Sequence, residues 1–165
     1  MAGNTSTKQN YEQVSYGGNA SMHTGSHRLV ISDGVSARTL LAKESGALCL
    51  FDRAAGTVYT LPAPVIGMNF EFQTTTTITS NAAKVITDAT TTFLLGTVDM
   101  VINTSATTLA ALGNGTTHVA ISSNGSTTGG VQGDSYKVTA ISSTQWVITG
   151  LVSGSGTLAT PFATS

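Results

Sequence analysis

The chain has 165 residues and a mass of 16.8 kDa, enough for one domain whose hydrophobic core needs neither disulfides nor metals. Only 9% of the residues are charged, against about 25% in an average soluble protein, and the formal net charge is −1. This balance disfavours nucleic-acid binding, which depends on a basic face.

The scarcity of charge points to a protein that assembles with others. The chain holds 29 Thr, 18 Ser and 18 Gly, so its solubility depends on hydroxyl and backbone groups. A monomer with a net charge near zero tends to self-associate. Surface that partners cover needs no charge to stay soluble, so the composition favours an assembling protein. A polar, Thr/Ser-rich monomer is the alternative.

Residues 1–28 are polar and poor in apolar side chains, and they cannot offset their own ordering entropy. We expect an extended N-terminal arm that contacts neighbouring subunits through Tyr11, Tyr16, His23 and His27. The two histidines are four residues apart, but the Thr, Gly and Ser between them argue against a helix that would align them as metal ligands.

No targeting or membrane segment is evident in the sequence. Residues 1–13 lack the hydrophobic region of a secretory signal. No apolar run approaches the roughly 18 residues that a membrane-spanning helix needs. We therefore expect synthesis in a cytoplasm and no membrane partner.

From residue 29 onward, short β-like runs alternate with turn residues. The runs cover residues 28–31, 39–41, 47–51, 57–61, 68–72, 84–86, 93–95, 100–102, 118–121, 135–141 and 145–149. Asp33-Gly34 is a strong turn signal, and residues 142–144 are typical of a hairpin loop. Only residues 107–112 are expected to form a helical turn, capped by Gly113. This spacing predicts that residues 29–165 form an all-β domain, a single antiparallel β-sandwich or a jelly-roll-like barrel.

The period-2 alternation also predicts the core. Phe70 and Phe72 share one face of their run, with Glu71 on the other face. Further aromatic residues occupy apolar positions in the other runs. The predicted structural core residues are Phe51, Phe70, Phe72, Tyr136 and Trp146.

The sequence offers little catalytic chemistry. It contains no nucleophile elbow, phosphate-binding loop or dinucleotide fingerprint. Cys49 lies in an apolar run, which indicates a buried and inert thiol, and His118 begins another such run and is expected to be structural. Asp52 and Glu71 could meet across strands like the paired acids of a glycosidase, but a turn and an outward strand position explain them equally well. We expect no enzyme activity, no metal and no cofactor.

Two stretches carry a family pattern. The first, residues 39–72, contains Ser45-Gly46, Phe51-Asp52, Thr60-Leu61-Pro62 and Phe70-Glu71-Phe72; the second runs from Gly133 to Trp146-Val147-Ile148-Thr149-Gly150. This pattern resembles structural proteins of tailed bacteriophages, namely small capsid decoration (cement) proteins and the β domains of head and tail fibres. The resemblance carries over no catalytic residue.

The resemblance implies a virion protein on the outer capsid surface. Such a decoration protein would be a homotrimer that bridges major capsid proteins and stabilises the shell. The alternative is a head- or tail-fibre module that binds host surface glycans. The size of the chain favours the decoration reading, because the sequence shows no shaft or anchoring domain. Solvent-exposed aromatic rings would favour the glycan-binding alternative.

Overall fold

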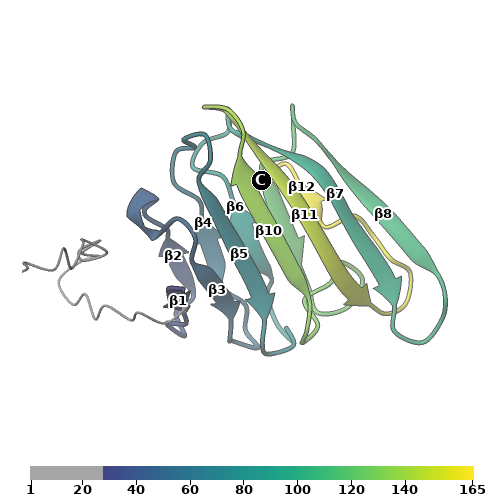
Figure 1. Ribbon diagram of the computed structural model, residues 1–165. Coiled ribbons are helices and arrows are strands. Elements are labelled where there is room, and N and C mark those ends of the chain that lie inside the picture. The colour runs from purple at the N-terminus through teal and green to yellow at the C-terminus, as the bar shows by residue number, and fades with distance from the viewer. Residues whose placement is uncertain (1–27) are drawn as a thin grey trace, which may run out of the picture.

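The computed structural model describes residues 28–165, which form two mixed β-sheets with almost no helix (Figure 1). The expected arm, apart from Arg28, lies outside the described residues, and so do Tyr11, Tyr16, His23 and His27. None of the helices in the part of the chain that is described has the length and apolar character needed to cross a membrane.

One sheet has seven strands and the other has five. The seven-stranded sheet contains, in spatial order, β1 (Val30–Ile31), β3 (Leu48–Phe51), β5 (Asn69–Thr74), β10 (Ser135–Ala140), β11 (Gln145–Gly154), β7 (Phe93–Ile102) and β8 (Thr108–Asn114). The five-stranded sheet contains β12 (Phe162–Ala163), β9 (Ala120–Ser123), β6 (Ala83–Ile86), β4 (Val58–Thr60) and β2 (Ala37–Thr39). The 3-10 helix η1 (Ala42–Glu44) follows β2.

The first six strands wind back and forth between the two sheets. Strands β1, β3 and β5 pair in parallel in one sheet, and β2, β4 and β6 pair in parallel in the other. Each strand returns to its sheet only after the chain has formed a strand in the opposite sheet, so neighbours run in the same direction. The Asp33-Gly34 turn accordingly connects β1 of one sheet to β2 of the other and does not form a hairpin.

The prediction of an antiparallel domain is therefore only partly confirmed, because both sheets are mixed. The pairs β5–β10, β10–β11, β7–β8, β6–β9 and β9–β12 are antiparallel, but β7 and β11 pair in parallel over ten residues. The side-chain alternation that marks a strand is the same in both pairing modes, so it carries no information on direction. The predicted hairpin loop at residues 142–144 is confirmed, because β10 and β11 are antiparallel neighbours on either side of it.

The helical turn expected at residues 107–112 is also wrong. Residues 108–112 belong to β8, which pairs with β7 and buries Ala111. The sequence Leu-Ala-Ala-Leu has local helix preference, but pairing with β7 and partial burial of Leu109 against the core outweigh it.

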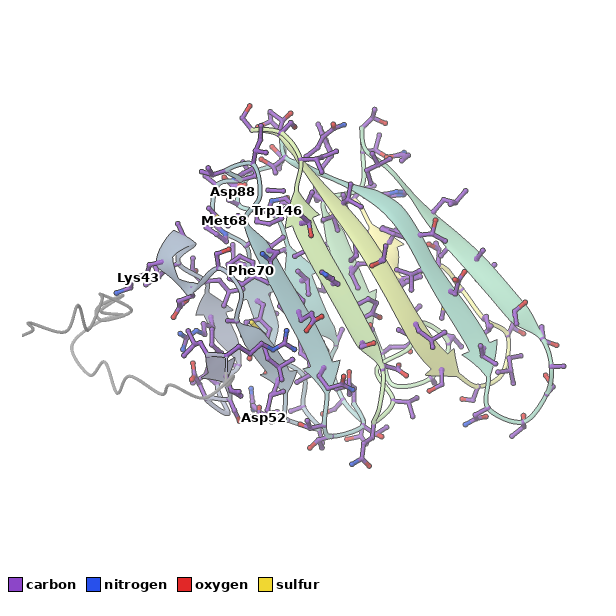
Figure 2. The ribbon with its side chains drawn as sticks, viewed as in Figure 1. Lys43, Asp52, Met68, Phe70, Asp88 and Trp146 are labelled. Carbon is purple, nitrogen blue, oxygen red and sulfur yellow. The ribbon has the colours of Figure 1, made fainter. Side chains whose placement is uncertain are left out.

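The two sheets share one hydrophobic core. Rings from both layers meet in it: Tyr59 of β4 lies with its centroid 5.4 Å from that of Phe51 and 5.6 Å from that of Phe72. Phe70 and Trp146 form a second aromatic pair, 6.1 Å apart (Figure 2). All five aromatic residues predicted for the core lie in this cluster, each at most 2% exposed.

The parallel pairing of β7 with β11 depends on one glycine. Gly96 has a φ of +135° and lies opposite Ile148. A Cβ atom at this position would lie 2.0 Å from the carbonyl oxygen of Ile148. Only glycine combines this backbone angle with such a close approach between strands.

Replacing Trp146 with alanine should strongly destabilise the fold. The side chain is fully buried, and removing a buried Trp costs about 3–5 kcal/mol, a large part of the roughly 5–15 kcal/mol that stabilises a domain. Thermal unfolding should show a melting temperature many degrees lower. Trp146 is the only tryptophan, so its native fluorescence should be blue-shifted and poorly quenched by iodide.

Trp146→Phe is the matched control. The indole Nε1 makes no hydrogen bond within the described residues, so phenylalanine sacrifices no bond and keeps an aromatic ring beside Phe70. Its melting temperature should fall much less than that of Trp146→Ala. Strong iodide quenching of the native protein and an unchanged melting temperature for Trp146→Ala would contradict the core assignment.

Candidate interaction surface

Asp52 and Glu71 do not form a catalytic pair. Leu48 lies opposite Glu71 and Phe51 lies opposite Thr74, so Asp52 is displaced along the sheet from Glu71 by four residues, about 13 Å. Glycosidase carboxylates lie about 5–9.5 Å apart. Asp52 instead accepts a hydrogen bond from Ser32 Oγ at 2.7 Å, and Glu71 pairs with Arg28. Both acids therefore have structural contacts.

Cys49 is a buried thiol on β3 with no exposed area. Burial, assisted by the negative charge of Glu44, raises the pKa of Cys49 to about 12. The thiolate is the reactive form of cysteine, and it is suppressed at neutral pH. The structure therefore makes Cys49 a packing residue of the core.

His118 has a structural environment. Its Nδ1 accepts a hydrogen bond from the backbone N–H of Asn114 at 3.2 Å, and its ring stacks on Phe162 at a centroid distance of 5.3 Å. Among residues 28–165, no group of three or more His, Cys, Asp or Glu side chains lies close enough to hold a metal ion.

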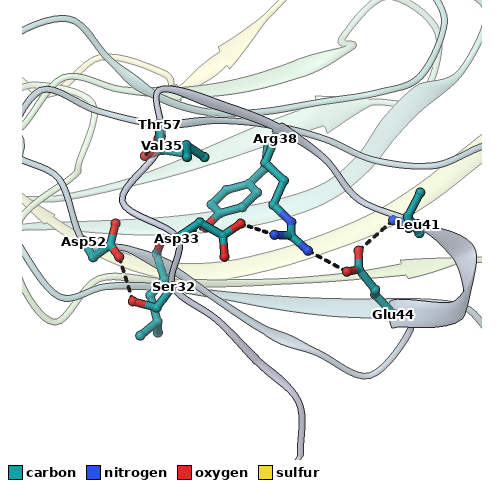
Figure 3. Close-up of polar contacts among 10 residues, drawn as sticks. Ser32, Asp33, Val35, Arg38, Leu41, Glu44, Asp52 and Thr57 are labelled. Carbon is teal, nitrogen blue, oxygen red and sulfur yellow. Dashed lines mark hydrogen bonds and ion pairs between the residues drawn. The ribbon is translucent and has the colours of Figure 1, made fainter. Parts of the chain in front are cut away.

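Arg38 holds the loops at the β1–β2 edge together (Figure 3). Its guanidinium donates to Asp33 and to Glu44, and a second oxygen of Glu44 accepts the Leu41 N–H at 2.9 Å. Burial lowers the pKa of Arg38, but the hydrogen bonds and charges of Asp33 and Glu44 outweigh it and leave that pKa raised. This ion-pair cluster ties β2 to η1.

Asp134 is a structural acid that the sequence analysis did not single out. Its side chain is only 3% exposed, and its two carboxylate oxygens accept bonds from the N–H groups of Gly130, Val131 and Ser153 and from Ser153 Oγ, at 2.8–3.0 Å. These contacts join the loop before β10 to the end of β11. The Gly-rich spacing before Asp134 was the available signal, and it indicated only a turn.

The outward side chains of the seven-stranded sheet form a broad surface, which we call the outer face (Figure 1). The strand registers place its residues in rows across the sheet. One row contains, from β3 to β8, Leu48, Glu71, Lys137, Thr149, Thr97 and Leu112. Charge in this row is confined to β5 and β10.

The β11–β7–β8 part of the outer face is apolar and nearly free of charge. Leu112 and Leu151 are 66% and 62% exposed, and Leu95 and Val101 are each more than a third exposed. Asp99 is the only charged residue on these three strands. Three strands of up to ten residues cover about 14 by 33 Å, several hundred Å². The exposed Leu and Val side chains of this area are interspersed with Thr97, Asp99 and Thr149, and apolar side chains gathered on one face commonly mark interaction sites.

An open depression of about 440 Å³ borders this apolar region. Arg28, Glu71 and Lys137 line it together with Leu48 and Leu151. Its charged side chains lie on the β5–β10 side, so the outer face offers an apolar half and a mixed-charge half. This combination suits contact with another protein surface, whose apolar centre is commonly bordered by polar groups.

No protein-family model matches this chain, and the searches of curated proteins and of solved structures also returned no match.

Cys49 should react only when the protein unfolds. In native protein at neutral pH, Ellman's reagent should modify the thiol slowly, and denaturant should make the reaction fast.

An unfolded cysteine loses its proton near pH 8.5, but the folded Cys49, whose pKa is raised, keeps its proton to about pH 12. The unfolded chain therefore binds fewer protons in between, and stability should fall as pH rises from about 9 to 12, by at most ~1.4 kcal/mol per pH unit.

Cys49→Ala is the control for this pH dependence. It should lower stability at every pH because it leaves a small cavity, but it should reduce the loss between pH 9 and 10, before tyrosines titrate. Rapid modification of the native thiol at neutral pH would contradict the burial of Cys49.

Proposed function

We propose that this chain is a structural virion protein, a capsid decoration (cement) protein that binds the outer capsid surface and bridges major capsid proteins. The observation that carries the proposal is the outer face, with its exposed Leu112 and Leu151 and its single charge over three strands. A broad sheet surface with an open depression fits a protein partner better than a small molecule, most of whose surface is commonly buried in its site. The resemblance of residues 39–72 and 133–150 to structural proteins of tailed bacteriophages, decoration proteins and fibre β domains alike, supports a role in the virion.

Shell stabilisation follows from mass action. A protein that binds the assembled shell but not its separated subunits stabilises the shell by RT ln(1 + [L]/Kd) for each site. Contacts across the outer face need only moderate affinity, because a shell offers many equivalent sites. Bridging requires that one copy touch two capsid subunits, which a sheet several strands wide can do.

The proposal includes a β-sandwich fold and a homotrimer. As a sandwich, the two mixed sheets would give the outer face a rigid support through the Phe51, Tyr59 and Phe72 rings. Three-fold assembly is consistent with the scarcity of charge, since obligate interfaces are depleted in charged residues. The capsid and further copies of the chain are then its partners, on the outside of a virion.

The alternative, a fibre module that binds host glycans, has less support. Sugar-binding surfaces commonly use exposed aromatic rings with polar neighbours. Among the described residues, every aromatic residue except the half-buried Phe93 is buried. Tyr11 and Tyr16 lie outside the described residues. The described residues therefore give less support to glycan binding than to the proposed capsid contact.

Immunogold labelling of virions tests the location. In the phage whose genome encodes this chain, an antibody against it should label the whole capsid surface, and capsids that lack the protein should break at lower temperature or after milder chelation. Gold confined to fibres, together with binding of the purified chain to host glycans, would contradict the proposal and favour the alternative.

Leu151→Asp should weaken binding to capsids by about tenfold or more, because it buries a charge in an apolar contact. The side chain is 62% exposed on the outer face, so the fold should tolerate the change. Ile66→Asp is the matched control, since Ile66 is 75% exposed in the β4–β5 loop, outside the strands that form that face. Co-sedimentation with protein-free capsids measures both variants; equal losses would show that the outer face is not the contact.

Deleting residues 1–26 should leave a folded β domain that attaches less well to capsids. These residues are poor in apolar side chains, and the hydrophobic core is made by later residues. Circular dichroism should show an unchanged β spectrum, and co-sedimentation should show weaker binding. An unfolded truncated protein would mean that the arm belongs to the core.

A further inference from the structure

Strand β8 is the one long free edge of the two sheets in residues 28–165. The other edge strands, β1, β2 and β12, have two or three residues, and β2 carries Arg38. β8 has seven residues, Thr108–Asn114, with no charge and no proline. Figure 1 shows it as the outermost strand on the right. Proteins usually prevent an edge strand from pairing with another chain by giving it charged residues or proline, or by keeping it short. An edge strand without these features therefore indicates a pairing surface.

The hydrogen-bond pattern identifies which backbone groups are free. The bonds from Ile102 N–H to the Thr107 oxygen and from Gly115 N–H to the Leu94 oxygen show that odd-numbered residues of this segment bond to β7. The N–H and C=O of Thr108, Ala110 and Leu112 therefore point to the free edge. Asn114 could extend this series, but its N–H already donates to His118 Nδ1. The available edge is thus three residues with Ala110 at its centre.

We propose that β8 pairs antiparallel with β8 of a second copy around a two-fold axis at Ala110. Ala110 then lies opposite Ala110 of the other copy, and Thr108 lies opposite its Leu112. Every free N–H and C=O of the three residues gains a partner. Leu112, which is 66% exposed on the outer face of one copy, gains Thr108 of the other copy as its neighbour across the new pair.

The sequence of β8 fits a second copy better than another strand. A two-fold contact places each side chain at the axis next to its own copy, so a charge there repels itself. The edge residues Thr108, Ala110 and Leu112 are neutral, and the residue at the axis is small. Pairing joins two seven-stranded sheets into one continuous sheet. It goes beyond capsid attachment, and a trimer could use it to join neighbouring trimers.

Sedimentation velocity of the full chain, without capsids, over a wide concentration range tests the pairing. Wild-type protein should form a species with an even number of copies. Ala110→Lys should raise its dissociation constant by about tenfold or more, because two lysines meet at the axis. Ala110→Pro should have a similar effect by removing an outward N–H that β7 does not use. Thr139→Lys, on the same outer face of β10, should leave the pairing unchanged.

Amide hydrogen exchange gives a second readout that does not depend on any variant folding. The amides of Ala110 and Leu112 should be protected in concentrated wild-type protein and become unprotected on dilution. The proposal is overturned if these amides exchange freely at every concentration, or if neither Ala110 variant changes the assembly. Protection that appears only after capsids are added would assign the edge to a capsid segment and also overturn it. Capsid binding is measured separately, so it can fail or succeed independently.

Discussion

The contact between Tyr59 of one sheet and Phe51 and Phe72 of the other holds the two layers together where the chain winds between them. All three rings are at most 2% exposed, with centroids 5.4–5.9 Å apart. The Tyr59 hydroxyl donates to the Leu50 carbonyl at 2.9 Å, so this buried polar group has a partner in the opposite sheet. The contact joins β4 of one sheet to β3 and β5 of the other, among the strands that alternate between the two sheets along the chain.

Among the described residues, two buried side-chain nitrogens, Arg38 Nε and Trp146 Nε1, lack a hydrogen-bond partner, but the buried Asp134 carboxylate and Tyr136 hydroxyl both have partners. Asp134 accepts four hydrogen bonds, and the buried Tyr136 hydroxyl lies 2.7 Å from Ser123 Oγ of the opposite sheet. Burial raises the pKa of Tyr136, and the phenol therefore remains protonated. Such bonds are stronger in a low-dielectric core than in water. In a chain with 9% charged residues, these hydrogen bonds join Tyr136 to the opposite sheet and the loop before β10 to β11.

The same scarcity of charge connects the core to the surface. A sheet with polar threonines and exposed leucines but one charge across β11, β7 and β8 presents little that would repel a protein partner. The proposed capsid contact uses the face of this sheet, and the proposed self-pairing uses its edge. The two surfaces meet at Leu112, so a lattice contact and a copy-to-copy contact could reinforce each other.

The sequence by itself determined the all-β class and the core aromatic residues, because period-2 alternation and burial are local consequences of side-chain chemistry. Phe70, Phe72 and Trp146 were assigned correctly to the interior in this way. It also indicated that Asp52 and Glu71 had simple structural explanations. Tertiary structure alone decided strand direction, the formation of strand β8 (Thr108–Asn114) and the anchoring role of Asp134. Each of these depends on a partner distant in the sequence: alternation does not encode direction, pairing with β7 overrides local helix preference, and Ser153 on β11 supplies two of the four hydrogen bonds to the Asp134 carboxylate.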